Sequence, residues 1–178
     1  MKIRLAAAAD IQCIAAVMRE SMAGLGTAFY DERQTRSAVQ YIAVIDPQLI
    51  DDGTYFVVED GDEVIACGGW SRRAKLFTGE SAGEGAGAPQ RLLDPAGEPA
   101  RVRAMFVAPS HVRRGVGRMI LDACEEAARA AGFTKVELMA TLPGEPLYAV
   151  CGYAVTERVE LTLPDGVRLG TARMEKTL

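Results

Sequence analysis

Residues 106–132, which read FVAPSHVRRGVGRMILDACEEAARAAG, constrain the fold of this chain more than any other part of the sequence. The segment from Arg101 to Ala108 predicts a strand, the Arg-Gly stretch predicts a turn, and apolar residues at helical spacing predict a helix over 116–131. Gly132 provides the C-cap of that helix, and KVELMAT after it predicts another strand. Strand, turn, helix and strand in this order imply a right-handed crossover between parallel strands.

Further strands and helices are predicted on both sides of this unit. Apolar residues recur at helical spacing after Asp10, which we interpret as an N-cap, and again over residues 31–44, where Pro47 ends the helix. Strand-forming residues flank the turns at residues 61–62 and 164–166, so both segments predict antiparallel hairpins. The sequence therefore predicts an α/β fold with a mixed sheet.

The length of 178 residues predicts a single domain with one core, spanning residues 1–178. Residues 76–100 are rich in Gly, Ala, Pro and acidic side chains and show neither helical nor strand periodicity. We therefore predict a long flexible loop in this region. Loops of this length in compact domains are usually functional lids or disordered inserts, and both interpretations are open here.

Charge and cysteine spacing argue against several classes of function. The net charge of -4 argues against nucleic-acid binding, which requires a basic excess. The four cysteines are far apart and His111 is the only histidine, so we expect no metal site. No apolar window is long enough to span a membrane, and Asp10 interrupts the apolar N-terminal stretch. We therefore expect a cytoplasmic protein without membrane association.

The Arg-Gly turn has the chemistry of an anion-binding site. Amide N–H groups at a helix N-terminus are free to bind an anion, and the helix dipole favours negative charge there. Gly115 and Gly117 allow a ligand to approach the backbone closely, while Arg113, Arg114 and Arg118 add positive charge. These features suit a diphosphate, and a purely structural turn between strand and helix is the alternative.

Two familiar nucleotide-binding motifs do not match this turn. The P-loop requires Gly-Lys followed by Ser or Thr, and no such sequence follows Gly115. The dinucleotide-binding motif G-x-G-x-x-G requires a third glycine at the position where this chain has Ile120. We therefore expect neither hydrolysis of nucleoside triphosphates nor binding of a dinucleotide.

The segment MFVAPSHVRRGVGRMIL resembles the signature of the GNAT superfamily of N-acetyltransferases, which places a (Gln/Arg)-x-x-Gly-x-(Gly/Ala) turn between a strand and a helix. Downstream, GEPLYAVCGYAV is similar to the Tyr-x-x-x-Gly-(Phe/Tyr) element of that family, with Tyr148, Gly152 and Tyr153 at its defined positions. The resemblance covers most of the chain and is most specific over residues 101–153. Val112 departs from the signature because it occupies the Gln/Arg position.

This resemblance implies a GNAT-like fold, with a mixed, mostly antiparallel central sheet flanked by helices, and an acetyl-CoA-dependent N-acetyltransferase activity. An amine of a small molecule or a peptide would attack the thioester directly in a ternary complex. Tyr148 would act as the general acid beside the thioester sulfur. The residues implied to bind the pantetheine arm and the pyrophosphate are Met105, Phe106, Val107, Arg113, Arg114, Gly115, Val116, Gly117 and Arg118.

The same features are compatible with other roles. A GNAT-like domain could bind acyl-CoA as a sensor or assembly module without turnover, and the coenzyme cradle does not dictate the nucleophile, so O-acyl transfer is compatible as well. Tyr148 could instead be a core residue beside Leu147 and Val150. A homodimer is compatible with the composition, and the sequence does not identify the acceptor.

Neither the general base nor the acceptor contacts have a single candidate. Some family members carry a glutamate at the position of Arg101, and arginine cannot accept a proton. Arg101 and Arg103 share one face of the predicted strand, where they would either clamp a carboxylate of the acceptor or pair with nearby acids. The candidates for the base are a chain of water molecules, Glu80, Glu84, Glu98 and His111.

Overall fold

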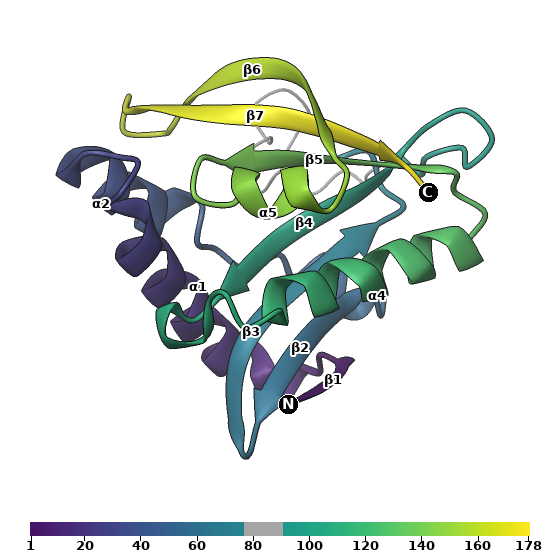
Figure 1. Ribbon diagram of the computed structural model, residues 1–178, viewed down its shortest axis with the longest axis horizontal. Coiled ribbons are helices and arrows are strands. Elements are labelled where there is room, and N and C mark those ends of the chain that lie inside the picture. The colour runs from purple at the N-terminus through teal and green to yellow at the C-terminus, as the bar shows by residue number, and fades with distance from the viewer. Residues whose placement is uncertain (77–90) are drawn as a thin grey trace.

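The computed structural model describes residues 1–76 and 91–178, and these form a seven-stranded sheet with helices on both faces (Figure 1). The strand order is β1-β2-β3-β4-β5-β7-β6, and among the described strands only β4 and β5 pair in parallel. This mixed, mostly antiparallel sheet confirms the predicted fold class. The strands are β1 (Lys2–Leu5), β2 (Tyr55–Asp60), β3 (Glu63–Ser71), β4 (Ala100–Val107), β5 (Lys135–Thr141), β6 (Ala154–Thr162) and β7 (Arg168–Thr177).

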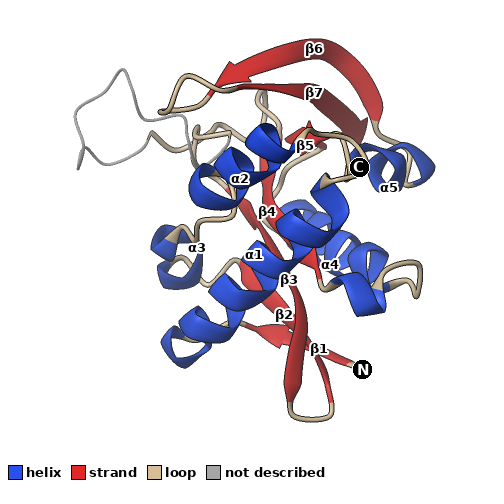
Figure 2. Ribbon diagram, turned by 90° about the vertical axis from the view of Figure 1, so that its left-hand side faces the viewer, coloured by secondary structure: helices blue, strands red, loops and turns tan. Residues whose placement is uncertain are grey.

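Two helical layers cover the sheet (Figure 2). The helices are α1 (Ile11–Gly26), α2 (Glu32–Tyr41), α3 (Pro47–Asp51), α4 (Val116–Ala130) and α5 (Glu145–Val150). The first layer, α1 to α3, buries residues such as Ile14 and Met18 in one core, and the second layer, α4 and α5, buries Ile120 and Leu121 in another. The central strands are therefore covered on both faces. No helix in the described part of the chain has the length and apolar character needed to cross a membrane.

Asp10 occupies the N-cap position of α1, as predicted, but its carboxylate does not cap the helix. The carboxylate accepts hydrogen bonds from the amide of Ala7 at 2.8 Å and from two nitrogens of Arg4 at 2.7 and 2.8 Å. These bonds with Arg4 lower the pKa of Asp10. Asp10 therefore ties β1 to the short 3-10 turn (Ala8–Asp10) that precedes α1, which is a tertiary role that the local sequence does not reveal.

The helix predicted over residues 31–44 is α2, which ends at Tyr41 and so before Pro47, and α3 is a further short helix that the sequence did not predict. Asp31 caps α2 by accepting a hydrogen bond from the amide of Gln34 at 2.7 Å. Asp46 caps α3 in the same way through the amide of Gln48 at 3.2 Å, and Pro47 is the first residue of α3. Proline restricts the residue before it but suits the first helical position, so Pro47 begins α3, whereas α2 has already ended at Tyr41.

The predicted loop at residues 76–100 falls partly outside the described residues. Residues 77–90, and with them the choice between a lid and an insert, are not described. The remaining part makes defined contacts with the protein. Leu92 forms an isolated β-bridge with Arg73, Leu93 is buried in the core on the α4 side, and Arg91 donates hydrogen bonds to Glu98 at 2.6 and 2.7 Å.

A bulge in β4 changes the direction of its side chains. Residues 67–69 of β3 face residues 103–106 of β4, so β4 contains one extra residue at this point. Ala104 adopts a left-handed conformation with φ of 52°, and its carbonyl oxygen accepts a hydrogen bond from the hydroxyl of Tyr55 at 2.7 Å. As a result, Met105 faces the α4 layer. In a regular strand Met105 would share the face of Arg103, which is the face covered by α1 to α3.

Near the bulge, β4 separates from β5. The two strands pair only between Ala100 and Val136 and between Arg101 and Glu137, while β5 continues to pair with β7 as far as Thr141. Residues 102–107 of β4 therefore have no strand partner on the β5 side among the described residues. An unpaired edge inside a sheet leaves backbone N–H and C=O groups available to a ligand.

Two glycines in β3 allow close approach of its neighbours, Gly68 beside the bulge of β4 and Gly69 beside the start of β2. A Cβ on Gly68 would lie 2.6 Å from Cγ of Met105 and 2.8 Å from Cγ2 of Ile120. A Cβ on Gly69 would lie 2.6 Å from the carbonyl oxygen of Thr54. Because Met105 is directed toward β3 by the bulge, only a residue without a side chain fits at Gly68.

We predict that Gly68→Ala lowers the free energy of unfolding by about 1–3 kcal/mol, because the added methyl group overpacks the core against Met105 and Ile120. Urea denaturation gives this value directly. Gly170→Ala is the matched control in another strand, since its nearest neighbour would be 3.9 Å away, and we expect a change below about 0.5 kcal/mol. A neutral Gly68→Ala would show that the bulge relaxes easily and does not require glycine.

Candidate functional site

The predicted anion-binding turn joins β4 to α4. Arg113 and Gly115 adopt left-handed conformations, with φ of 63° and 83°, and α4 begins directly afterwards at Val116. The amide of Met119 donates to the carbonyl oxygen of Gly115 at 3.0 Å. This is the first hydrogen bond of the helix, so the amide N–H groups of the residues before Met119 have no helical carbonyl to bind. They are directed out of the N-terminus of α4. This geometry is that of an anion-binding concavity.

Positive charge surrounds this turn. Arg113 and Arg114 are exposed, and neither forms an ion pair with any residue that the structure describes. Arg118 makes a long contact of 3.7 Å with Asp122 one helical turn later, and both side chains are 61% exposed. Such an exposed contact contributes little and leaves Arg118 free to rotate toward a ligand.

Gly117 has a packing role that the sequence did not reveal. A Cβ at this position would lie 2.8 Å from Cδ2 of Leu147 and 3.6 Å from Cγ2 of Val107. Gly117 therefore allows the N-terminus of α4 to approach both α5 and the unpaired end of β4 closely.

The three β4 residues implied to line the pantetheine arm point in two directions. Met105 and Val107 pack at the edge of the core on the α4 side, while the side chain of Phe106 is buried in the core on the α1 side. Only the main chain of Phe106 is thus available at the gap between β4 and β5. Met105 and Val107 provide apolar surface beside the anion-binding turn.

Tyr148 lies on α5 and is 8% exposed. Its ring meets that of Tyr153 edge-on, with centroids 5.8 Å apart. No hydrogen bond joins its hydroxyl to any residue in the described part of the chain. Burial is the main cause that raises the pKa of Tyr148 well above its ordinary value, so the phenol stays protonated at neutral pH. A protonated phenol without an internal partner can donate a hydrogen bond to a ligand.

Arg101 is paired within the protein. It donates a hydrogen bond to Glu137 across the last β4–β5 pair, and Arg173 of β7 donates to the same carboxylate at 2.8 and 2.9 Å. Glu137 is completely buried. Glu137 was not predicted to lie at the site. A glutamate inside the apolar strand segment KVELMAT nevertheless indicates a buried ion pair.

Arg103 is also paired with an acid. It is 4% exposed and donates a hydrogen bond to Asp46 at 2.7 Å, and Lys75 lies 3.5 Å from the same carboxylate. Burial raises the pKa of Asp46, but the charge and hydrogen bond of Arg103 outweigh burial, so the pKa lies below its usual value. Arg101 and Arg103 thus share a face, as predicted, and both are held by internal acids.

Two of the predicted candidates for a general base, Glu98 and His111, lie within the described residues. The carboxylate of Glu98 accepts hydrogen bonds from Arg91, which are the main cause that lowers the pKa of Glu98 to about 2. His111 lies in the 3-10 turn after β4, where its Nδ1 is 2.9 Å from the hydroxyl of Ser110 and its Nε2 is 3.6 Å from Asp60. Two further candidates, Glu80 and Glu84, fall outside the described residues.

The cysteines do not provide a nucleophile for the site. Cys67, Cys124 and Cys151 are buried and Cys13 is exposed on α1. Burial raises the pKa of Cys67 to about 12 and also raises that of Cys124, so both thiols stay protonated. Within residues 1–76 and 91–178, no cluster of His, Cys, Asp and Glu could hold a metal ion.

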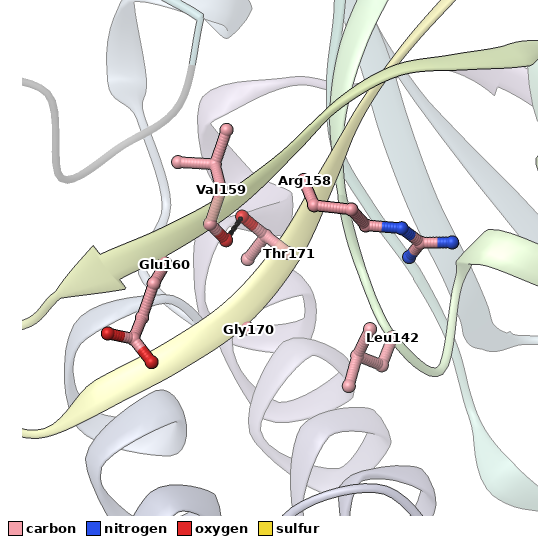
Figure 3. Close-up of a pocket in the computed structure, with 6 residues that line it drawn as sticks. All are labelled: Leu142, Arg158, Val159, Glu160, Gly170 and Thr171. Atoms are coloured by element: carbon pink, nitrogen blue, oxygen red, sulfur yellow. Dashed lines mark hydrogen bonds between the residues drawn. The ribbon is translucent and has the colours of Figure 1, made fainter.

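A shallow hollow of about 240 Å³ lies between the β6–β7 hairpin and the segment that follows β5 (Figure 3). The hydroxyl of Tyr30 holds its walls together, because it donates to the carbonyl oxygen of Gly170 at 2.8 Å and accepts from the amide of Leu142 at 2.9 Å. Thr171, another lining residue, contacts the sulfur of Met139 at 3.3 Å, on the part of β5 that has separated from β4. Tyr30 was not predicted to lie at the site from the sequence.

Comparison with protein families places most of this chain in one group. Residues 17–153 match the model of the acetyltransferase (GNAT) family. The matched region contains the unpaired edge of β4, the anion-binding turn and Tyr148. No protein of curated function matches the sequence significantly.

Solved structures share the fold over nearly the whole chain. A GCN5-related N-acetyltransferase from Rhodopseudomonas palustris is 19% identical with a TM-score of 0.74, over 99% of this chain and 95% of its own. PaiA N-acetyltransferase from Thermoplasma acidophilum, solved with coenzyme A, is 14% identical with a TM-score of 0.67, over 99% and 98%. YncA from Salmonella typhimurium, solved with acetyl-CoA, is 19% identical with a TM-score of 0.64, over 100% and 94%.

We predict that Asp46→Asn lowers the free energy of unfolding by about 3–5 kcal/mol, because it leaves the buried charge of Arg103 without its acid. Asparagine keeps the ability to cap a helix, so the loss measures the ion pair and not the cap. Asp31→Asn, at the exposed cap of α2, is the control, and we expect a change below about 0.5 kcal/mol.

The pH dependence of this loss gives a second measurement. The folded-state pKa of Asp46 lies below its unfolded value of about 3.9, so the ion pair stabilises fully above that pH and is lost as the pH falls through the folded pKa. The gap between wild type and Asp46→Asn should therefore be wide at pH 7 and shrink below about pH 4. Urea denaturation at both values checks this, and a gap that is independent of pH would contradict it.

Proposed function

Because the chain belongs to the GNAT family of acetyltransferases, we propose that it transfers the acetyl group of acetyl-CoA to a primary amine of a small molecule or a peptide. The observation that carries this proposal is the place where β4 leaves β5, directly beside the anion-binding N-terminus of α4. The complexes of PaiA with coenzyme A and of YncA with acetyl-CoA support the choice of acyl donor.

The residues around this junction fit coenzyme A. The free amide groups before Met119 and the exposed side chains of Arg113 and Arg114 suit a pyrophosphate. The unpaired edge of β4 suits the amide groups of a pantetheine arm, which would add to the sheet as an extra strand. Met105 and Val107 would contact the aliphatic part of that arm.

Residues of this chain would stabilise the charges that develop during transfer. Acetyl-CoA supplies an activated acyl group, and an edge amide of β4 would donate to the carbonyl oxygen as it becomes negative. Tyr148, which retains its proton because burial raises its pKa, would donate to the departing sulfur. The remaining acceleration would come from holding the amine and the thioester together, without an acyl-enzyme intermediate.

We propose that water takes the proton of the acceptor amine. Glu137 is completely buried and held by Arg101 and Arg173, and the pKa of Glu98 is too low for a general base at neutral pH. The acceptor would approach past the hollow lined by Leu142 and Thr171, because Thr171 contacts Met139 on the separated part of β5.

We predict that Gly117→Val weakens acetyl-CoA binding by about 10-fold or more, since the side chain obstructs the approach of the coenzyme to the backbone of α4. Isothermal titration calorimetry measures the affinity. Leu147→Ala alone should bind acetyl-CoA nearly as wild type does. The double variant, Gly117→Val with Leu147→Ala, removes the clash between the new valine and Leu147 within the protein. If the valine obstructs the coenzyme itself, acetyl-CoA binding to the double variant should stay weak. Restored affinity in the double variant would instead assign Gly117 to packing between α4 and α5.

The experiment that tests the proposed function follows release of free thiol from acetyl-CoA with 4-aminobutyrate, isopentylamine, 1,4-diaminobutane and the peptide Ser-Gly-Gly as acceptors. We expect acceptor-dependent release, and we expect Tyr148→Phe to lower kcat by about 10²- to 10⁴-fold with the coenzyme affinity unchanged, because only the phenolic proton is removed. Tyr41→Phe, on α2, is the control and should retain wild-type kcat. Coenzyme binding without release for any amine would support a sensor, and an unaffected kcat in Tyr148→Phe, with chemistry limiting turnover, would exclude Tyr148 as the acid.

A further inference from the structure

A buried polar cluster lies behind Tyr148, formed by Glu125 of α4, Lys176 of β7 and Tyr153, which follows α5. We call these three residues the support cluster. Lys176 donates a hydrogen bond to Oε2 of Glu125 at 2.6 Å, and the carboxylate side chain is only 6% exposed. The ammonium nitrogen of Lys176 also lies 5.6 Å from the ring centroid of Tyr153. The cluster thus joins three elements that are distant in sequence.

Two polar atoms of the support cluster are buried without a hydrogen bond. These atoms are Oε1 of Glu125 and the hydroxyl oxygen of Tyr153, which is 4% exposed as a residue. The two groups are close enough that Glu125, after burial itself, raises the pKa of Tyr153. A small rotation would let the phenol donate to the free carboxylate oxygen and satisfy both atoms. Unsatisfied buried groups are costly, so such a pair in a native protein requires an explanation.

The contacts of Tyr148 indicate what the support cluster does. The ring of Tyr148 meets the ring of Tyr153 at an interplanar angle of 60°, and on its other side a Cβ at Gly144 would lie 3.1 Å from its Cε2 atom. Because no described residue forms a hydrogen bond with the hydroxyl of Tyr148, ring packing alone sets its direction. Any tilt of Tyr153 is therefore transmitted to the hydroxyl of Tyr148.

We infer that Tyr153, held by Glu125 and Lys176, is a positioning residue for the acid Tyr148. After the small rotation described above, the phenol of Tyr153 would donate to Oε1 of Glu125, and this bond would fix the ring against which Tyr148 packs. The inference rests on the proposed function, since it acts through Tyr148 as the proton donor. A purely structural cluster, which only joins α4 to β7, would affect stability but not the reaction step that uses Tyr148.

A double-mutant cycle on kcat tests this inference. Tyr153→Phe keeps the ring and removes the hydroxyl, and Glu125→Gln keeps the shape and removes the charge. We expect each to lower kcat by about 3- to 30-fold without a change in acetyl-CoA affinity by calorimetry. In a Tyr148→Phe background, the same changes should have no further effect on kcat, because the group that they position is absent. Tyr41→Phe is the matched control and should leave kcat unchanged in both backgrounds.

The outcomes separate this inference from the proposed function. Equal reductions in both backgrounds, or a wild-type kcat in Tyr153→Phe, would overturn the inference and leave the acid role of Tyr148 intact. A Tyr148→Phe variant with wild-type kcat would overturn both the acid role of Tyr148 and the positioning role of Tyr153. If no amine supports turnover, the transferase proposal fails and kcat cannot test the inference. The NMR resonance of the ¹³C-labelled Cζ atom of Tyr148 then tests it, and this resonance is identified by its loss in Tyr148→Phe. We expect Tyr153→Phe and Glu125→Gln to shift that resonance, and an unmoved resonance would overturn the positioning role.

Discussion

The interrupted pairing between β4 and β5 is the constraint on which the rest of the site depends. Parallel strands in the middle of a sheet normally pair along their whole length, because unpaired backbone groups are costly inside a protein. Here the pairing ends after Arg101 and Glu137, and the bulge at Ala104 turns the rest of β4 away from regular alternation. The end of the freed edge lies close to the N-terminus of α4, so in the proposed function a diphosphate would bind at the turn and an amide-bearing arm along the edge.

Buried charges hold the opposite side of this junction. Glu137 binds Arg101 and Arg173 at the point where the strands part, and Asp46 binds Arg103 just before the bulge. These pairs use the acids that could otherwise have served as a base, and they occupy the arginines that could have bound an acceptor carboxylate. In the proposed mechanism the site would therefore rely on backbone donors, a protonated tyrosine and positioning, and its acceptor contacts would come from other residues.

The candidate site was predictable where its chemistry is local. The Arg-Gly turn and the helix after it follow from spacing over a few residues, because helix capping and left-handed turns depend on immediate neighbours, whereas the role of Tyr148 was expected only from the resemblance to the GNAT family. The roles of Asp46, Glu137 and Tyr30 were not predictable, since each meets partners more than 30 residues away. Gly117 was identified for its backbone freedom, while its close approach to Leu147 appears only when α4 and α5 are packed together.

The sequence by itself determined the order of most strands and helices along the chain, the hairpins and the parallel crossover, because these depend on periodicity and turn residues that each segment carries alone. The family was indicated separately, by the resemblance of two motifs to the GNAT signature. Only the tertiary structure decided how far β4 and β5 remain paired, which face Met105 occupies and which acids neutralise Arg101 and Arg103. These features depend on the bulge opposite Gly68 and on contacts between distant segments. A local pattern cannot encode them, since the same strand sequence would alternate regularly beside a different neighbour.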